Sequence, residues 1–343
     1  MQNGTHEIRA DNVEPVLVQR EIFGLEAMPV RFRTTKHIFN PEKYPHINTQ
    51  GLSSINASGS GGWTVENFPR TIEYLRSALG AKNIVVIDLR KESHCYINKL
   101  PYLWFATPEG APVRQNGAKD AAPVRQNGVK KNTAYDWYND EKTGEQIIQD
   151  ESERAALLAA EGKTTIWQII ASPFTHEIVD PSKKNLIKIE EIVTEADLVQ
   201  QAHVETGVPV HENGVKYIRL PVTDHNGPAI EIIDQFVHVV QTHKDKWLHI
   251  HCLGGKGRTT TFLTLLDIIH NAKNLDLVSI GQRQTALCNG ERNLFDPTSG
   301  TPWQVPIAQE RLENLKKFYQ YCKENNDGFA TKFSTWLKSN VST

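Results

Sequence analysis

The stretch of sequence that decides the fold is His251-Cys252-Leu253-Gly254-Gly255-Lys256-Gly257-Arg258-Thr259. It lies between an apolar run at 247–250, which we expect to be a strand, and a mostly apolar helix expected at 259–270. A loop that enters a helix N-terminus points backbone N–H groups and the positive end of the helix dipole at whatever lies above it. The three glycines allow the backbone to curl closely, so that successive N–H groups can form a nest for an anion.

Several side chains of this loop add chemistry to that backbone. Arg258 offers a planar fork of donors that matches two oxygens of a phosphate. Cys252 lies in the same positive field, which favours its thiolate form, the form that attacks phosphorus. Thr259 can donate its hydroxyl to that sulfur. His251 is expected to orient the loop and favour the thiolate, or to be a hydrogen-bonded core histidine; both can hold together.

The rest of the loop is expected to bind substrate oxygens. It is not a nucleotide-binding Walker A loop, because the required glycine is missing and Arg258 follows Gly257. Lys256 adds a charge that favours a polyanionic substrate over a singly phosphorylated peptide, the alternative being a solvated lysine. The remaining expected contacts come from Leu253, Gly254, Gly255 and Gly257.

Outward from the loop, short apolar runs alternate with helical patterns. We expect strands at 84–87, 165–170, 186–192 and 217–220, and helices at 65–79, 149–161, 194–204, 229–241 and 308–325. Such alternation predicts an α/β fold with a mostly parallel sheet flanked by helices. Residues 1–62, which include a Gly/Ser-rich part, are expected to be irregular.

Residues 107–163 have a different character. The string Ala-Pro-Val-Arg-Gln-Asn-Gly occurs twice, at 111–117 and 122–128. Two copies do not make a solenoid, which needs at least three units. The repeat therefore predicts a recent duplication in a surface loop.

Composition excludes several classes of function. The chain has 343 residues, a formal net charge of -2 and four cysteines without paired spacing. The chain has no excess of basic residues, so a nucleic-acid partner is not expected. Its apolar stretches are too short for a membrane span, and its residues form no cluster from which a metal or another cofactor would be predicted. The first 14 residues contain no apolar signal core, so we expect a cytoplasmic protein with reduced thiols.

The His-Cys-x5-Arg-Thr pattern resembles the Cys-x5-Arg phosphatases of the protein tyrosine phosphatase superfamily. Further segments narrow the resemblance to the bacterial cysteine phytases, which are tyrosine-phosphatase-like inositol polyphosphate phosphatases. The resemblance covers roughly residues 21–105 and 164–340 and fails across the duplicated loop. The segments that carry it are Asp88-Leu89-Arg90-x-Glu92-Ser93-His94, Phe32-Arg33-Thr34, Ser58-Gly59-Ser60, Thr223-Asp224-His225 and Trp336-Leu337-Lys338-Ser339.

The resemblance implies a phosphatase core beside a small partial β-barrel. The implied segments are an N-terminal contribution to the barrel at 1–62, the first part of the core at 63–106, an insertion at 107–163, barrel strands at 164–193, and the rest of the core with the catalytic loop at 194–343.

It also implies a two-step mechanism without a metal. Cys252 would form a cysteinyl-phosphate, and Asp224 would protonate the leaving oxygen and then activate water; the alternative for Asp224 is a turn or helix cap. Arg258 and the loop amides would bind the equatorial oxygens of the transition state. Five further residues match family positions near the substrate or its supporting shell: Arg33, Arg90, Lys91, His94 and His225.

The expected function is hydrolysis of phosphomonoesters of myo-inositol polyphosphates such as phytate. The alternatives are a protein tyrosine or phosphoinositide phosphatase on the same scaffold, and a non-catalytic pseudo-phosphatase that binds inositol phosphate. The expected partner is a small polyanionic substrate; the sequence predicts no oligomeric state. Besides the cytoplasm, an effector delivered into a host cytosol fits the resemblance.

Overall fold

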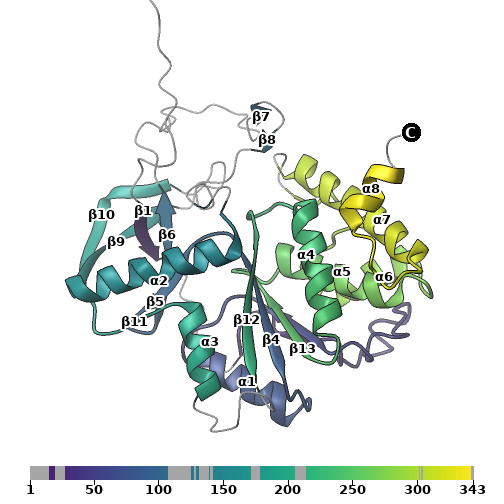
Figure 1. Cartoon of the computed structure of the whole chain (residues 1–343), viewed down its shortest axis with the longest axis horizontal. Coiled ribbons are helices and arrows are strands. Elements are labelled where there is room, and N and C mark those ends of the chain that lie inside the picture. The colour runs from purple at the N-terminus through teal and green to yellow at the C-terminus, as the bar shows by residue number, and fades with distance from the viewer. Residues whose placement is uncertain are drawn as a thin grey trace, which may run out of the picture. The chain divides into compact units, whose positions relative to one another are not determined.

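A computed structural model of the chain describes residues 15–19, 28–106, 125–126, 129–130, 139, 142–170, 178–204, 214–300, 302 and 304–340. The chain divides into two compact units (Figure 1). The larger unit comprises residues 23–90 and 196–343, and the smaller comprises residues 1–22 and 91–195. The chain therefore enters the larger unit twice, and the five-segment division expected from the sequence stays a prediction.

The larger unit is built on a five-stranded sheet with the order β12-β4-β13-β3-β2. Neighbouring strands are parallel from β12 to β3, and β2 alone is antiparallel to β3. The strands are β12 (Val215–Val222), β4 (Ile84–Arg90), β13 (Trp247–His251), β3 (Ala57–Ser60) and β2 (Arg33–Thr34). With its flanking helices, this sheet confirms the predicted α/β fold with a mostly parallel sheet.

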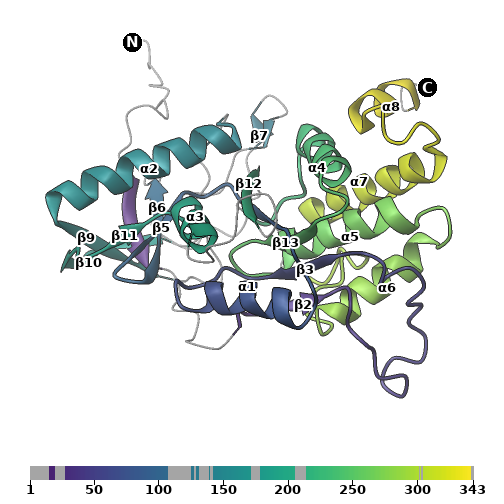
Figure 2. The ribbon, with the colours of Figure 1, turned by 60° about the horizontal axis from the view of Figure 1, so that its bottom comes forward.

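The two faces of this sheet carry different side chains because successive residues of a strand point to opposite faces. On β13, Leu248 and Ile250 join the main hydrophobic core, to which helix α5 (Gly257–Asn271) contributes Phe262. His249 lies on the other face, where its ring stacks on Trp63, whose indole contacts helix α1 (Asn67–Ser77). Figure 2 shows α1 and α5 on different sides of β3.

Further helices complete the larger unit. Helix α5 packs against α6 (Leu277–Leu287) and α7 (Val305–Glu324), and α4 (Ile230–Thr242) packs against β12 and α8 (Phe333–Asn340). A buried ion pair between Asp267 and Arg283 ties α5 to α6. The sequence analysis placed no element at α6 or α8, yet Asp276 caps α6 by accepting a hydrogen bond from the Ser279 backbone at 2.9 Å. That cap was a sequence signal for the start of α6.

The expectation that residues 1–62 are irregular is wrong at Pro15–Gln19, at Arg33–Thr34 and at Ala57–Ser60, which are strands. Ala57–Ser60 form β3, a fully buried strand that pairs with the central strand β13. A Cβ at Gly59 would lie 2.8 Å from both Leu263 Cδ1 and Thr259 Cγ2, so only glycine fits beneath α5 at this point. Close packing therefore requires a composition that is otherwise typical of loops.

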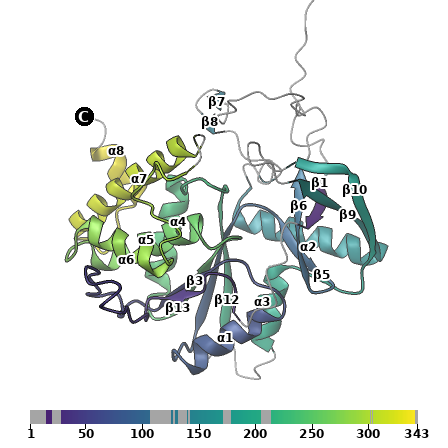
Figure 3. The same ribbon diagram turned by 180° about the vertical axis from the view of Figure 1, so that it is seen from behind.

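The smaller unit contains a six-stranded, mostly antiparallel sheet with the order β10-β9-β1-β6-β5-β11 (Figure 3). Only β1 and β9 run parallel. Four of its strands, β1, β9, β10 and β11, lie in the segments for which the resemblance implies a partial barrel, whereas β5 and β6 lie in the segment expected to begin the phosphatase core. Its strands are β10 (Ile178–Lys188), β9 (Lys163–Ile170), β1 (Pro15–Gln19), β6 (Leu100–Ala106), β5 (His94–Ile97) and β11 (Ile192–Val193).

Helix α2 (Gly144–Glu161) contacts this sheet through β9, β5 and β11. A capping box joins Thr143 and Gln146 at its start, and Gly162 ends it in the left-handed region at φ 67°. The helix begins five residues before the expected 149. Helix α3 (Glu195–Val204) follows β11, within one residue of its expected bounds.

The duplicated loop lies almost wholly outside the described residues. Of 111–128, the structure describes only β7 (Arg125–Gln126), which pairs with β8 (Val129–Lys130). In the part of the chain that is described, none of the helices is both long and apolar enough to cross a membrane.

Candidate active site

The carboxyl ends of three parallel strands bring together the residues that the sequence singled out. The loop at 251–259 follows β13, Arg90 ends β4, and Asp224 follows β12. Because these strands are adjacent and parallel, their carboxyl ends lie at one edge of the sheet. Ligands of open α/β sheets bind at this edge.

Cys252 lies at the bottom of the loop. Its side chain is buried, and the Thr259 hydroxyl lies 3.2 Å from the sulfur, within donating distance. The same hydroxyl also lies 3.1 Å from the backbone carbonyl of Ser60. Thr259 occupies the first turn of α5, so the positive end of that helix faces the sulfur.

Arg258 is buried and spans the loop toward β12. Its Nη1 donates to the backbone carbonyl of Val222 at 3.1 Å, and its Nη2 lies 3.1 Å from Asp224 Oδ1. The guanidinium therefore links the catalytic loop to the segment that carries the expected proton donor. Asp224 Oδ1 also accepts from the backbone N–H of His225 at 3.0 Å, which holds the carboxylate against Arg258.

Glycine is required where the loop backbone approaches β3. Gly255 has φ 69°, in the left-handed region, and a Cβ there would lie 2.5 Å from the Gly61 backbone nitrogen. Gly62 in turn donates its N–H to the Leu253 carbonyl at 2.8 Å. The end of β3 is thus a backbone support for the loop, and the sequence signal for it was the Gly/Ser run at 58–62. We call Cys252, Gly255, Arg258 and Thr259 the floor of the site.

Asp88 joins three strands behind the loop. Its Oδ2 accepts from Tyr217 Oη and pairs with Arg219 Nη1, both at 2.8 Å. Its Oδ1 lies 3.3 Å from Arg90 Nε and 4.0 Å from His251 Nε2. The Arg90 and His251 side chains are buried, which places both in the support of the site behind the floor.

Arg33 is also buried, beneath the loop. Its Nη2 donates to Thr260 Oγ1 and its Nη1 to the backbone carbonyl of Arg31, each at 3.0 Å. Burial lowers the pKa of Arg33, an effect opposed by the electrostatic contributions of the nearby Cys288 and Cys252 side chains. Arg33 therefore holds the segment before β2 against the start of α5.

Three charged side chains that solvent reaches, of which Arg31 is partly buried, lie beside the floor, and we call Arg31, Lys256 and Glu291 the rim. Glu291 Oε2 lies 2.8 Å from Arg31 Nε and 2.9 Å from Lys256 Nζ. Arg31 Nη1 also donates to the Gly254 carbonyl at 3.0 Å. The sequence analysis identified Lys256, but it missed Arg31 and Glu291 because they are distant from the loop in the chain.

Arg311 on α7 is a third residue that the sequence did not assign to the site. Its Nη1 donates to the His225 carbonyl at 3.3 Å and would lie 3.8 Å from a Cβ at Gly257. Burial and the neighbouring charge of Arg292 lower its pKa to about 9. Its buried Nε has no hydrogen-bond partner among the described residues. A buried cation in this setting favours an anion beside it.

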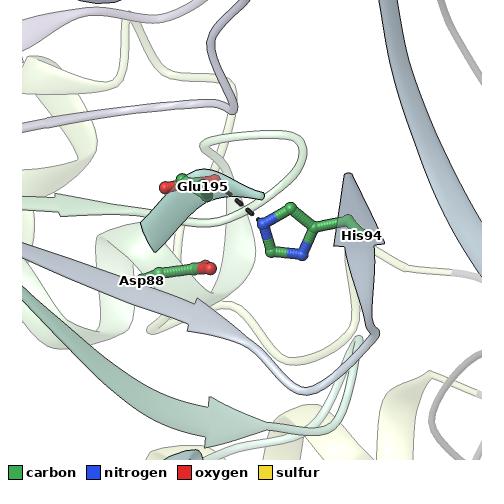
Figure 4. A group of neighbouring side chains, drawn as sticks. All are labelled: Asp88, His94 and Glu195. Carbon is green, nitrogen blue, oxygen red and sulfur yellow. Dashed lines mark hydrogen bonds and ion pairs between the residues drawn. The ribbon is translucent and has the colours of Figure 1, made fainter. Parts of the chain in front are cut away.

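Two expected substrate contacts, Lys91 and His94, belong to the smaller unit. The Lys91 carbonyl accepts from Asn139 Nδ2 at 2.7 Å. His94 Nε2 lies 2.9 Å from Glu195 Oε2 (Figure 4), and its Nδ1 lies 3.1 Å from the Glu92 carbonyl. Both ring nitrogens of His94 are thus used within that unit, and contact of these two residues with substrate stays a prediction.

Fold and loop together define a class of protein: the Cys-x5-Arg phosphatases, whose loop joins a central strand to a helix N-terminus. A family model for protein tyrosine phosphatase-like phytases, described as "Inositol hexakisphosphate", matches residues 124–270.

The chain is also similar to individual proteins. The effector protein HopD2 of Pseudomonas syringae pv. tomato is 27% identical over 309 residues, which cover 89% of this chain and 56% of HopD2. A solved PTP-like myo-inositol phosphatase from Mitsuokella multacida, in complex with myo-inositol-(1,3,4,5)-tetrakisphosphate, is 25% identical with a TM-score of 0.71, over 96% of this chain and 48% of that one. A PTP-like phytase from Bdellovibrio bacteriovorus shares the fold at 24% identity and a TM-score of 0.61, over 95% of both chains.

The chain matches the protein tyrosine phosphatase-like phytase family over residues 124–270, and its fold is similar to those of solved phosphatases of that kind. It spans about half the length of HopD2 and of the Mitsuokella protein.

Proposed function

We propose that this protein hydrolyses phosphomonoesters of myo-inositol polyphosphates through a cysteinyl-phosphate intermediate. The observation that carries the proposal is the floor: a buried sulfur within reach of the Thr259 hydroxyl, at the N-terminus of the helix whose first turn also carries the buried Arg258. These are the groups that a displacement at phosphorus requires.

In the first step, the Cys252 sulfur attacks phosphorus and the bond to the inositol oxygen breaks. The phosphoryl group carries its charge on three equatorial oxygens, which the loop N–H groups and the Arg258 fork receive. The Thr259 hydroxyl stabilises the sulfur as attacking group in this step and as leaving group in the next.

The leaving alkoxide of an inositol is a strong base, so it needs a proton from a neighbouring acid. Asp224 supports this role because Arg258 and the His225 N–H hold its carboxyl group at the edge of the floor. In the second step the same carboxylate takes a proton from water, which attacks the cysteinyl-phosphate and releases inorganic phosphate and the thiolate.

A polyanionic substrate is favoured by cations beyond the single phosphate that the loop holds. Lys256 and Arg31 lie beside the floor, and Arg311 lies under the His225 carbonyl next to Asp224. A further phosphate on the same inositol ring would meet these charges, whereas a singly phosphorylated peptide offers no second phosphate. This difference favours an inositol polyphosphate over a phosphotyrosine substrate.

Phosphate release from purified protein tests the proposal. We expect turnover of phytate and a loss of at least about 10⁴-fold in Cys252→Ser, because serine is a far weaker nucleophile here. Asp224→Asn should slow phytate hydrolysis about 10²–10⁴-fold but slow p-nitrophenyl phosphate much less, since that leaving group needs no proton. Retained turnover in Cys252→Ser would overturn the covalent route, and equal losses in Asp224→Asn would remove Asp224 as the acid.

Two other outcomes would replace the proposal. Rapid turnover of a phosphotyrosine peptide or a phosphoinositide without turnover of phytate would assign the site to those substrates. Binding of inositol phosphate with no turnover of any phosphomonoester would make the protein a pseudo-phosphatase.

The similarity to HopD2 also supports a proposal about where the protein acts. HopD2 is named an effector protein, and it aligns with most of this chain. We propose that this protein likewise acts on inositol phosphates in the cytosol of a host cell. Detection of a tagged chain in host cytosol during infection tests this, and retention inside the bacterium would contradict it.

A further inference from the structure

The rim contains a carboxylate among the cations that would attract a polyanion. Arg31, Lys256 and Glu291 come from three separate segments: the turn before β2, the catalytic loop and the turn after α6. One oxygen, Glu291 Oε2, contacts both cations, at 2.8 Å and 2.9 Å. The two cations therefore share one counter-ion.

Stability does not explain this arrangement. The side chains of Arg31, Lys256 and Glu291 are 27%, 45% and 36% exposed, and ion pairs between such exposed groups add little to folding free energy. Exposed pairs also exchange partners easily, because water and incoming ions reach them. The contact is thus weak enough for a ligand to replace.

The charge balance of the rim depends on Glu291. Hydrogen bonds from Lys256 and Arg31 hold the pKa of Glu291 below its ordinary value. The carboxylate therefore stays ionised at neutral pH and is lost only as the pH falls through that lowered value. With Glu291 ionised, the three side chains sum to one positive charge; without it, they would sum to two.

We propose that Glu291 is a built-in competitor for the phosphate groups of the substrate, and that it limits how tightly the rim holds a highly phosphorylated ligand. This inference rests on the proposed function and concerns the phosphates that are not being cleaved. The phosphate in the loop meets the floor and does not compete with Glu291. A second phosphate beside it reaches the Lys256 ammonium and the Arg31 guanidinium only by replacing the carboxylate.

The competitor acts on one substrate class more than another. A singly phosphorylated compound such as p-nitrophenyl phosphate fills the floor alone, so the rim contributes little to its binding. For a polyphosphate, the rim contributes binding free energy that increases with the positive charge that Glu291 leaves uncompensated. Glu291 is in this sense a specificity-determining residue.

The test compares Glu291→Gln with a matched variant. Asp245 is an exposed carboxylate 3.2 Å from Lys246, ahead of β13, so the five-residue strand separates it from the loop by roughly 16 Å. Asp245→Asn removes the same charge from a similar ion pair at the opposite edge of the same sheet. Both variants would be titrated with myo-inositol hexakissulfate, a polyanion without phosphoester bonds, and assayed with p-nitrophenyl phosphate.

We expect Glu291→Gln to bind the hexakissulfate about 3- to 10-fold more tightly at low salt, with the gain shrinking as ionic strength rises. The KM for p-nitrophenyl phosphate should change less than about 2-fold, and Asp245→Asn should match the unaltered protein on both ligands. In a Lys256→Met background, Glu291→Gln should increase the affinity for the hexakissulfate by a smaller factor, because one of the two cations for which Glu291 competes is then absent.

Three results would overturn the inference. The first is an equal increase in hexakissulfate affinity in Asp245→Asn, and the second is no increase in Glu291→Gln. The third is a loss of kcat on p-nitrophenyl phosphate in Glu291→Gln, which would mean that Glu291 holds the loop in place. Failure of the proposed function is separate: it would show as absent phosphate release by the unaltered protein, while the hexakissulfate titrations would still measure the competition at the rim.

Discussion

The floor and the rim of the site are adjacent but are built on opposite principles. The floor is buried, and glycine is required where its backbone meets β3. The rim is exposed, and its three charged side chains contact one another through a single carboxylate oxygen. The difference teaches that chemistry at phosphorus needs groups that cannot move, whereas selection among substrates needs charges that can exchange partners.

Among the substitutions that compare the floor with the rim, Arg258→Lys is expected to have the largest effect, because it changes the geometry of the floor while keeping its charge. Lysine cannot reproduce the fork that reaches both the Val222 carbonyl and Asp224 at 3.1 Å. We expect kcat to fall about 10²–10³-fold on phytate and on p-nitrophenyl phosphate alike. Steady-state kinetics with both substrates provides the measurement, and a loss below threefold on either would mean that charge alone suffices.

Gly255→Ala tests the packing of the floor against β3. Gly80→Ala is a matched control, because Gly80 has the same φ of 69° but open space where its Cβ would lie. The control should lower the free energy of unfolding by about 1–2 kcal/mol through backbone strain alone. Gly255→Ala adds a clash with the Gly61 backbone and should lower the free energy of unfolding by a further 1–3 kcal/mol or so.

Urea unfolding followed by circular dichroism measures both glycine variants. Equal losses would show that the loop and β3 can separate without a penalty, which would contradict a rigid floor. Activity should fall only in Gly255→Ala, because Gly80 follows α1, away from the loop in the chain.

Lys256→Met is expected to have the smallest effect, since it alters the rim and leaves the floor intact. The exposed ammonium is partly offset by Glu291. The KM for phytate should rise about 10-fold while kcat changes little, and p-nitrophenyl phosphate kinetics should change less than about 3-fold. An equal loss on both substrates would place Lys256 in the floor.

Much of the core was predictable because local patterns and tertiary packing agree there. The strand at 247–251, the loop and the helix α5 follow from apolar periodicity and from glycines at a helix start. The order of strands and helices likewise indicated the α/β fold. Bounds were less predictable, as for α2, whose capping box at Thr143 begins the helix before its apolar pattern becomes evident.

Other parts were not predictable because their composition has more than one structural meaning. Ala57–Ser60 has the composition of a loop and is a buried strand, since α5 leaves no room for a larger side chain at Gly59. For Arg33 and Arg90 the sequence left open a place near the substrate or in the supporting shell, and the structure places both side chains buried and hydrogen-bonded; contact with substrate stays a prediction.

By itself, the sequence determined that a cysteine and an arginine share one short loop at a helix start, because their spacing is covalent and local. Only the tertiary structure decided which distant residues meet that loop. Glu291 and Arg311 lie 39 and 59 residues from Cys252 along the chain, in segments that helix packing brings close to the loop. The distance between two residues along the chain does not predict whether they meet. Their contact depends on how the faces of helices and strands pack against one another.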